Sequence, residues 1–115
     1  LLGVTFKANT DDMRESSSLK IIPALSKKGA LITYYDPTGE KKEFNKIKNV
    51  QFKPSIKTAC ENSDLIIIHT EWNDFKSIDY KKIIKKKNFK IYDMRNIYSS
   101  EKMKKDEIKY FSIGR

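Results

Sequence analysis

The run of residues 64–70, Asp-Leu-Ile-Ile-Ile-His-Thr, constrains the fold more than any other part of the chain. Its four central residues are all apolar, with no polar residue at alternate positions. A continuous apolar run is typical of a strand buried on both faces of a parallel sheet, whereas a strand with one wet face alternates. We therefore predict a buried parallel strand over Leu65–His69.

Other apolar or β-branched runs predict strands on both sides of this one. The full set is Leu1–Thr5, Leu31–Tyr35, Val50–Phe52, Leu65–His69, Lys90–Tyr92 and Tyr110–Ile113. Helices are expected between them, at Ser17–Lys28, Ser55–Asn62, Asp79–Lys86 (with Asp79 as N-cap) and Ser100–Lys105. Strands that alternate with helices indicate an α/β fold, here a Rossmann-like, mostly parallel sheet with helices on both faces. Pro23 inside the first helix should kink it or lie close to its first turn.

Length and cysteine content set the broad class. At 115 residues the chain reads as one domain, residues 1–115, and no stretch approaches the ~18 apolar residues of a membrane span. Because there is no starting methionine, we interpret it as a domain excised from a longer protein. The single cysteine, Cys60, forbids an internal disulfide and fits a reducing compartment, which predicts a cytoplasmic protein.

Neither Cys60 nor His69, the only histidine, belongs to a set of metal ligands or to a nucleophile–base pair in the sequence. We therefore predict no metal site and no catalytic residue, and interpret Cys60 as a small structural residue. His69 follows the buried strand and could be a ligand at the strand end. A structural role is the favoured interpretation.

The net charge of +9 raises the question of nucleic-acid binding. Of the 24 basic residues, 21 are lysine and only 3 are arginine. Nucleic-acid readers depend on arginine for bidentate contacts, and these lysines are interleaved with apolar helix positions. We expect solvated helix faces and no nucleic-acid partner. In a chain that almost always uses lysine, Arg14 and Arg95 stand out, and both lie in irregular sequence after a predicted strand.

Open α/β sheets bind ligands outside the carboxyl ends of their strands. The segments that follow predicted strands are Phe6–Ser18, Asp36, Thr70–Phe75 and Asp93–Tyr98. A common dinucleotide site would need a glycine-rich turn after the first strand, and here Gly3 is followed by Phe-Lys-Ala-Asn-Thr-Asp-Asp. Asp36 could hold a ribose, but an aspartate before Pro37 is better explained as the start of a turn.

A phosphate could instead be bound by side chains, with Lys7 as a point charge and Arg95 as a planar fork. The acidic residues of the same loop, Asp11, Asp12 and Glu15, are expected to orient the basic residues or to cap the helix near Ser16–Ser18. A surface loop held by Asp–Arg pairs is the alternative.

Four separated motifs carry a family resemblance. They are GVTFKANTDDMRESSSLKIIPALSKKGALITYYDP, TEWNDFKSIDY, YDMRNIY and the terminal YFSIGR. Over essentially the whole chain these resemble the C-terminal UDP-binding domain of the UDP-glucose 6-dehydrogenase family, within the UDP-glucose/GDP-mannose dehydrogenases. The related domains of UDP-N-acetylmannosamine and GDP-mannose dehydrogenases remain alternatives, as does a stand-alone basic α/β binding module.

The resemblance implies an enzyme with an NAD-binding N-terminal domain, a central helical segment and this domain, acting as a homodimer. Such an enzyme oxidises the C6 alcohol of a UDP-sugar to a carboxylate in two NAD-dependent steps, through a cysteine thioester. The nucleophilic cysteine of the family lies upstream of this domain, so the fragment alone is expected to be inactive. By resemblance, Lys7 and Arg95 contact the UDP-sugar, and Arg14 reaches the NAD bound by the other domain.

Overall fold

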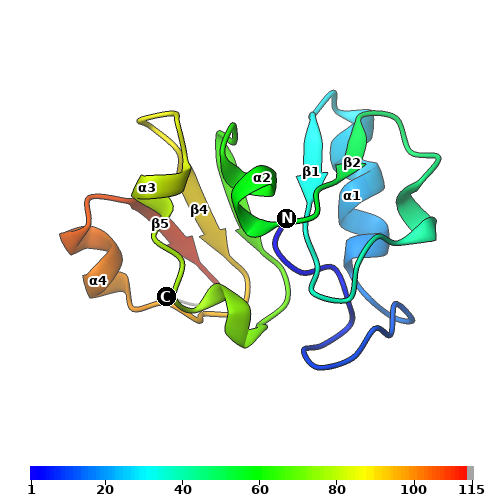
Figure 1. Ribbon diagram of the computed structural model, residues 1–115, viewed down its shortest axis with the longest axis horizontal. Helices are drawn as coiled ribbons and strands as arrows, with labels where there is room; N and C mark the ends of the chain where they lie inside the picture. Colours follow the sequence, from blue (N-terminus) through cyan, green and yellow to red (C-terminus); the bar gives the residue numbers. More distant parts are fainter. Residues whose placement is uncertain (114–115) are drawn as a thin grey trace.

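The computed structural model describes residues 1–113 and contains a parallel sheet built in two parts around the start of the chain (Figure 1). One part pairs β1 (Ile32–Tyr34) with β2 (Val50–Phe52), and the other pairs β3 (Leu65–Ile68), β4 (Lys90–Asp93) and β5 (Lys109–Ser112) in that order. Leu2 forms parallel bridges to Tyr35 on one side and Ile68 on the other. The resulting order, with the first segment in the middle, is that of a doubly wound sheet.

The predicted strand Leu1–Thr5 is reduced to this one bridging residue. Gly3 takes a positive φ of 79°, which ends the extended conformation. The next amide, that of Val4, donates to the Asp36 carboxylate (2.8 Å) instead of to a strand carbonyl. The prediction was therefore right about the position of the segment and wrong about its length.

The helices are α1 (Ser18–Lys27), α2 (Ile56–Cys60), α3 (Tyr80–Ile83) and α4 (Ser100–Lys105), with 3-10 turns η1 (Lys42–Phe44) and η2 (Asn73–Phe75). The expected helix Asp79–Lys86 is shorter than predicted because Ile84 is extended, and the Asp79 side chain makes no capping bond. Pro23 lies inside α1 and not in its first turn. Ser55 and Ser99 cap α2 and α4 by accepting backbone N–H bonds.

Two apolar cores place the helices on opposite faces of the sheet. Ile22 of α1 packs with Ile32 and Tyr34, alternate residues of β1 that share one face. Thr33, between them, points the other way and donates its hydroxyl to the Ala59 carbonyl of α2 (2.8 Å). The second core packs α2, α3 and α4 against β3 and β4. The predicted α/β fold with helices on both faces is confirmed.

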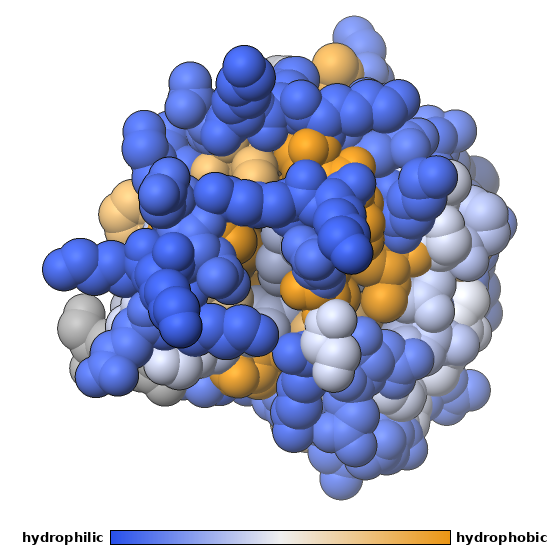
Figure 2. Space-filling model, turned by 60° about the vertical axis from the view of Figure 1, so that its left-hand side comes forward, coloured by the Kyte–Doolittle hydropathy of each residue, from blue (hydrophilic) through white to orange (hydrophobic). Residues whose placement is uncertain are grey.

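On the side that carries α4, Figure 2 shows mostly hydrophilic residues, with hydrophobic residues visible between them. The lysines of α3 and α4 are exposed while Tyr80 and Met103 point inward, as expected for solvated helix faces. Within residues 1–113 no helix is long and apolar enough to cross a membrane.

Candidate functional site at the carboxyl edge of the sheet

The first crossover loop, residues 6–17, lies at the carboxyl edge and holds its shape through backbone bonds. The Phe6 amide donates to the Asp12 carbonyl (2.9 Å), which closes the loop on itself. Asn9 and Glu15 have positive φ values of 64° and 63°. Lys7 is exposed in this loop, and within the described residues its ammonium group makes no ion pair.

Glu71 joins this loop to Arg95. Its Oε1 accepts the backbone N–H of Ala8, the residue after Lys7 (3.3 Å). Its Oε2 lies 3.5 Å from Nε of Arg95. The Glu71 carboxylate therefore contacts the backbone next to Lys7 and the side chain of Arg95, the two predicted substrate residues. The structure brings Lys7 and Arg95 to the same part of the edge.

Arg95 is held in place by its own loop as well. Its Nε donates to the His69 carbonyl (2.7 Å), directly after β3. The fully buried Asp93, which ends β4, accepts the backbone N–H groups of Arg95 (3.0 Å), Ile97 (2.8 Å) and Tyr98 (3.2 Å). One buried carboxylate thus folds the loop that carries the arginine. Within residues 1–113 the two terminal nitrogens of Arg95 have no hydrogen bond.

His69 is fully buried, and its tautomer follows from its neighbours. The Thr70 hydroxyl donates its only proton to the Thr5 carbonyl (3.0 Å), so it accepts from Nδ1–H of His69 (3.0 Å). Nε2 is then the acceptor for the Ser17 hydroxyl (2.8 Å). Burial, followed by the charge of Arg95, lowers the pKa of His69 to about 4. The favoured structural interpretation of His69 is confirmed, although the ring lies directly behind the candidate site.

The three consecutive serines connect α1 to the first segment of the chain. Ser16 and Ser18 both donate their hydroxyls to the Val4 carbonyl (2.6 Å each), which ties α1 to the first segment. Ser17 makes no capping bond, and no acidic residue lies in the first turn of α1. Capping of this helix was one of the two roles predicted for the acidic residues of the loop, and it is not observed, because none of them lies in the first turn of α1.

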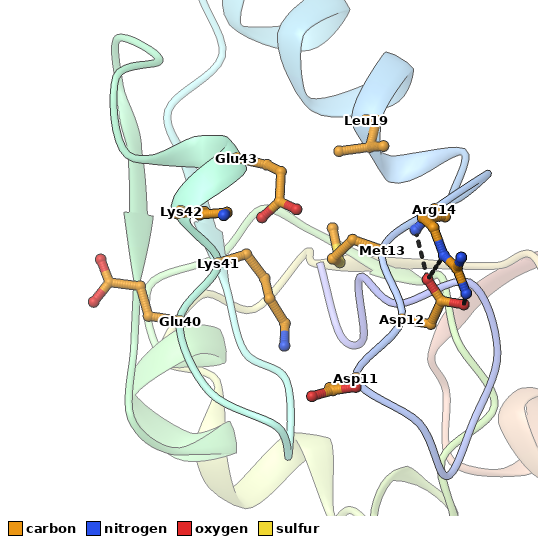
Figure 3. A pocket seen from close by; sticks show the side chains of 9 residues that line it. All are labelled: Asp11, Asp12, Met13, Arg14, Leu19, Glu40, Lys41, Lys42 and Glu43. Carbon is orange, nitrogen blue, oxygen red and sulfur yellow. Dashed lines mark hydrogen bonds and ion pairs between the residues drawn. The ribbon is translucent and has the colours of Figure 1, made fainter.

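Arg14 lies apart from the Glu71 group. Its side chain is 90% exposed and forms a two-point ion pair with Asp12 (3.1 Å for each contact). The hydrogen bonds from Arg14 hold the pKa of Asp12 below its usual value. This pair borders a cavity of about 550 Å³ between the loop and residues 40–43, into which Asp11 and Lys41 project (Figure 3). This contact fits both interpretations made from the sequence, an acid that orients a basic residue and a surface loop held by an Asp–Arg pair.

Asp36 and Cys60, two other residues considered from the sequence, have structural roles. Asp36 is 1% exposed and accepts from the Val4 amide and from the amide and hydroxyl of Thr38 (2.9 and 2.6 Å). The turn interpretation is therefore confirmed. Cys60 is buried, and burial raises the pKa of its thiol to about 11, which leaves no reactive thiolate at neutral pH. Within residues 1–113 no cluster of ligating side chains could hold a metal ion.

Sequence reasoning missed Glu71 and Asp93. Asp93 could have been found, because an aspartate at a strand end followed by an irregular loop is typical of side-chain turn formation. Glu71 carries no such signal, since its partners are distant in sequence. Gly114 and Arg115 of the terminal motif lie outside the described residues.

Comparisons with known proteins show the family of the chain. A sequence model described as the UDP-glucose/GDP-mannose dehydrogenase family, UDP binding domain, matches residues 1–100. The UDP-glucose 6-dehydrogenase of Rhizobium meliloti (strain 1021) is 37% identical over 118 residues, which cover 100% of this chain and 26% of that protein.

Two solved structures share the fold. The UDP-D-ManNAc dehydrogenase from Pyrococcus horikoshii has a TM-score of 0.72 and 29% identity, covering 99% of this chain and 24% of that one. A UDP-glucose dehydrogenase from the hyperthermophilic archaeon Pyrobaculum islandicum has a TM-score of 0.74 and 26% identity, covering 96% and 23%. The chain spans about a quarter of the length of these relatives. It belongs to the UDP-glucose/GDP-mannose dehydrogenase family, in which it matches the UDP-binding domain.

Proposed function

We propose that this chain is the C-terminal UDP-sugar-binding domain of an NAD-dependent UDP-glucose 6-dehydrogenase, which oxidises UDP-glucose to UDP-glucuronate in two steps. The observation that carries the proposal is that Glu71 contacts both Arg95 and the amide of Ala8, the neighbour of Lys7, so that two basic residues lie at the carboxyl edge of the sheet. The relatives named UDP-glucose 6-dehydrogenase support the choice of sugar. We also propose that the longer enzyme is a cytoplasmic homodimer.

In this proposal Lys7 and Arg95 each contact part of the same diphosphate. The free terminal nitrogens of Arg95 suit a two-point contact with phosphate oxygens, and Lys7 adds a point charge from an exposed loop. NAD would be bound mainly by a domain outside this chain and would accept the hydrides. Arg14, exposed and separate from the Glu71 group, is the residue we assign to the cofactor side.

A UDP-N-acetylmannosamine dehydrogenase is the second candidate, favoured by the structural likeness to the Pyrococcus horikoshii protein. The two candidates share the UDP moiety, so UDP binding alone does not separate them. Turnover of UDP-glucose and UDP-N-acetylmannosamine by the longer enzyme does.

UDP titrated into the chain is expected to perturb amide NMR signals of the loops around Lys7 and Arg95. Charge-assisted contacts are worth about 1.5–3 kcal/mol each, and partial exposure reduces this. Alanine at either residue should therefore weaken UDP binding roughly three- to thirtyfold. Arg95→Lys should restore binding only in part, because an ammonium group lacks the planar fork.

Arg14→Ala is the matched control in this titration. It removes one positive charge from the same edge and should leave UDP affinity nearly unchanged, while raising the KM for NAD in the longer enzyme. Signal changes confined to other regions, or an Arg14→Ala loss equal to that of Lys7→Ala, would refute this division of roles.

The chain by itself is expected to produce no NADH from UDP-glucose and NAD. Its only thiol, Cys60, is buried and carries a raised pKa, so it cannot act as the nucleophile of the second oxidation. The measurement is NADH absorbance with purified chain. Turnover that disappears in Cys60→Ala would show that our structural interpretation of Cys60 is mistaken.

A further inference from the structure

We infer that Glu71 is a positioning residue of the substrate site, which holds the Arg95 guanidinium so that its terminal nitrogens face the ligand. The inference rests on the proposed function. In this inference Glu71 does not contact the phosphate itself. A carboxylate in an anion site repels the ligand, so its presence there needs another reason, such as holding a neighbouring cationic side chain. Glu71 lies where it can do that, between the Ala8 amide and Nε of Arg95.

Arg95 needs such support because its side chain is long and 36% exposed. A free arginine side chain loses conformational entropy when it binds, and prior ordering reduces that cost. The Nε–H of Arg95 donates to the His69 carbonyl (2.7 Å), and Oε2 of Glu71 lies 3.5 Å from the same nitrogen as an ion pair. Both lie on the Nε side, so they leave the far edge of the guanidinium available.

The contacts that hold Glu71 indicate how it orients Arg95. The Ala8 N–H fixes Oε1 at 3.3 Å, and the other oxygen then faces Arg95. Both distances exceed the usual 2.7–3.2 Å, so the carboxylate acts through its charge as much as through hydrogen bonds. Because its side chain is 40% exposed, its removal should cost little stability. A role in ligand binding is thus separable from a role in folding.

Glu71→Ala is expected to weaken UDP binding about three- to tenfold, because Arg95 must then be ordered by the ligand. Glu71→Gln, which keeps an acceptor oxygen but not the charge, should fall between wild type and Glu71→Ala. The matched control is Glu61→Ala, which makes the same change in net charge at a partly buried glutamate that precedes the amino end of β3 and should leave affinity unchanged. The melting temperature of all three variants should stay close to that of wild type.

Double substitutions identify the residue through which Glu71 acts. In an Arg95→Ala background, Glu71→Ala should have no further effect on UDP affinity, whereas in a Lys7→Ala background it should keep its full effect. An equal loss in both backgrounds, or tighter UDP binding by Glu71→Ala, would overturn the inference.

A measurement without ligand separates this inference from the proposed function. The Nε–Hε NMR signal of Arg95, identified by its loss in Arg95→Lys, should exchange faster with water in Glu71→Ala than in wild type or Glu61→Ala. If UDP fails to bind wild type, the proposed function fails, and this exchange rate still decides whether Glu71 holds Arg95. An unchanged exchange rate would show that the His69 carbonyl alone holds the arginine.

Discussion

Gly3→Ala is expected to lower the free energy of unfolding by about 3 kcal/mol, a large part of the ~5–15 kcal/mol typical of a domain. Gly3 has a φ of +79°, a conformation that costs a residue with a side chain ~1–2 kcal/mol. An alanine Cβ would also lie 2.6 Å from Cβ of Thr70 and 3.1 Å from its backbone nitrogen. A backbone atom cannot rotate away, so the clash should add ~1–3 kcal/mol.

Gly39→Ala is the matched control for the backbone conformation. Gly39 has a φ of +95°, and nothing lies within 4 Å of its hypothetical Cβ. Urea unfolding should therefore show a loss of only ~1–2 kcal/mol for Gly39→Ala, from strain alone. Equal losses for the two variants would show that the region around Thr70 yields to the added methyl group without cost.

The consequence of Gly3→Ala should extend to the candidate site. Thr70 contacts Gly3, and its hydroxyl connects Nδ1 of His69 to the Thr5 carbonyl. The His69 carbonyl in turn accepts from Arg95. Displacement of Thr70 should thus move the arginine. Gly3 serves close packing between the first segment and the end of β3.

The local elements were predictable where nearby residues determine them. Helix α4 has the predicted bounds, Ser100–Lys105, because Ser99 caps it and Met103 supplies its inward side chain. Strand β3 follows from its apolar run, although it ends at Ile68, one residue earlier than predicted, and Leu65 at its start is exposed. Arg95 was singled out by the rarity of arginine in a lysine-rich chain, and its position after a strand followed from the predicted strand Lys90–Tyr92.

What could not be predicted depends on contacts between residues far apart in sequence. The first strand is interrupted by the hydrogen bond from Val4 to Asp36, 32 residues away. No pattern within residues 1–5 predicts this interruption. The Glu71 contact to Ala8 spans 63 residues. Exposed polar residues carry no periodic signal, so the arrangement of the site needed the folded structure even though its basic residues were found.

His69 is expected to titrate near pH 4, well below its usual value of 6.5. The physical reason is burial of the ring, which disfavours the imidazolium, reinforced by the positive charge of Arg95. Because His69 is the only histidine, its ring signals can be followed by NMR without assignment of competing histidines. At neutral pH, ¹⁵N shifts should show the proton on Nδ1 and a bare Nε2, as the bonds to Thr70 and Ser17 require.

The lowered pKa has a defined effect on stability. Between about pH 6.5 and pH 4 the unfolded chain binds a proton that the folded chain does not, so the free energy of unfolding falls as the pH drops through this window. The contribution of His69 is fully present above pH 6.5, and its loss by pH 4 amounts to about 3 kcal/mol. Below pH 4 both states are protonated and His69 causes no further change.

Two variants test the cause. His69→Gln removes the titrating group, so its free energy of unfolding should depend less on pH between 6.5 and 4, by about 3 kcal/mol in total, with urea unfolding as the measurement. Arg95→Ala removes the neighbouring charge and should raise the pKa of His69 while leaving it below 6.5, because burial is the larger cause. A wild-type pKa near 6.5 would mean that the ring is hydrated, and the hydrogen bonds that connect it to Ser17 and Thr70 would then not persist in solution.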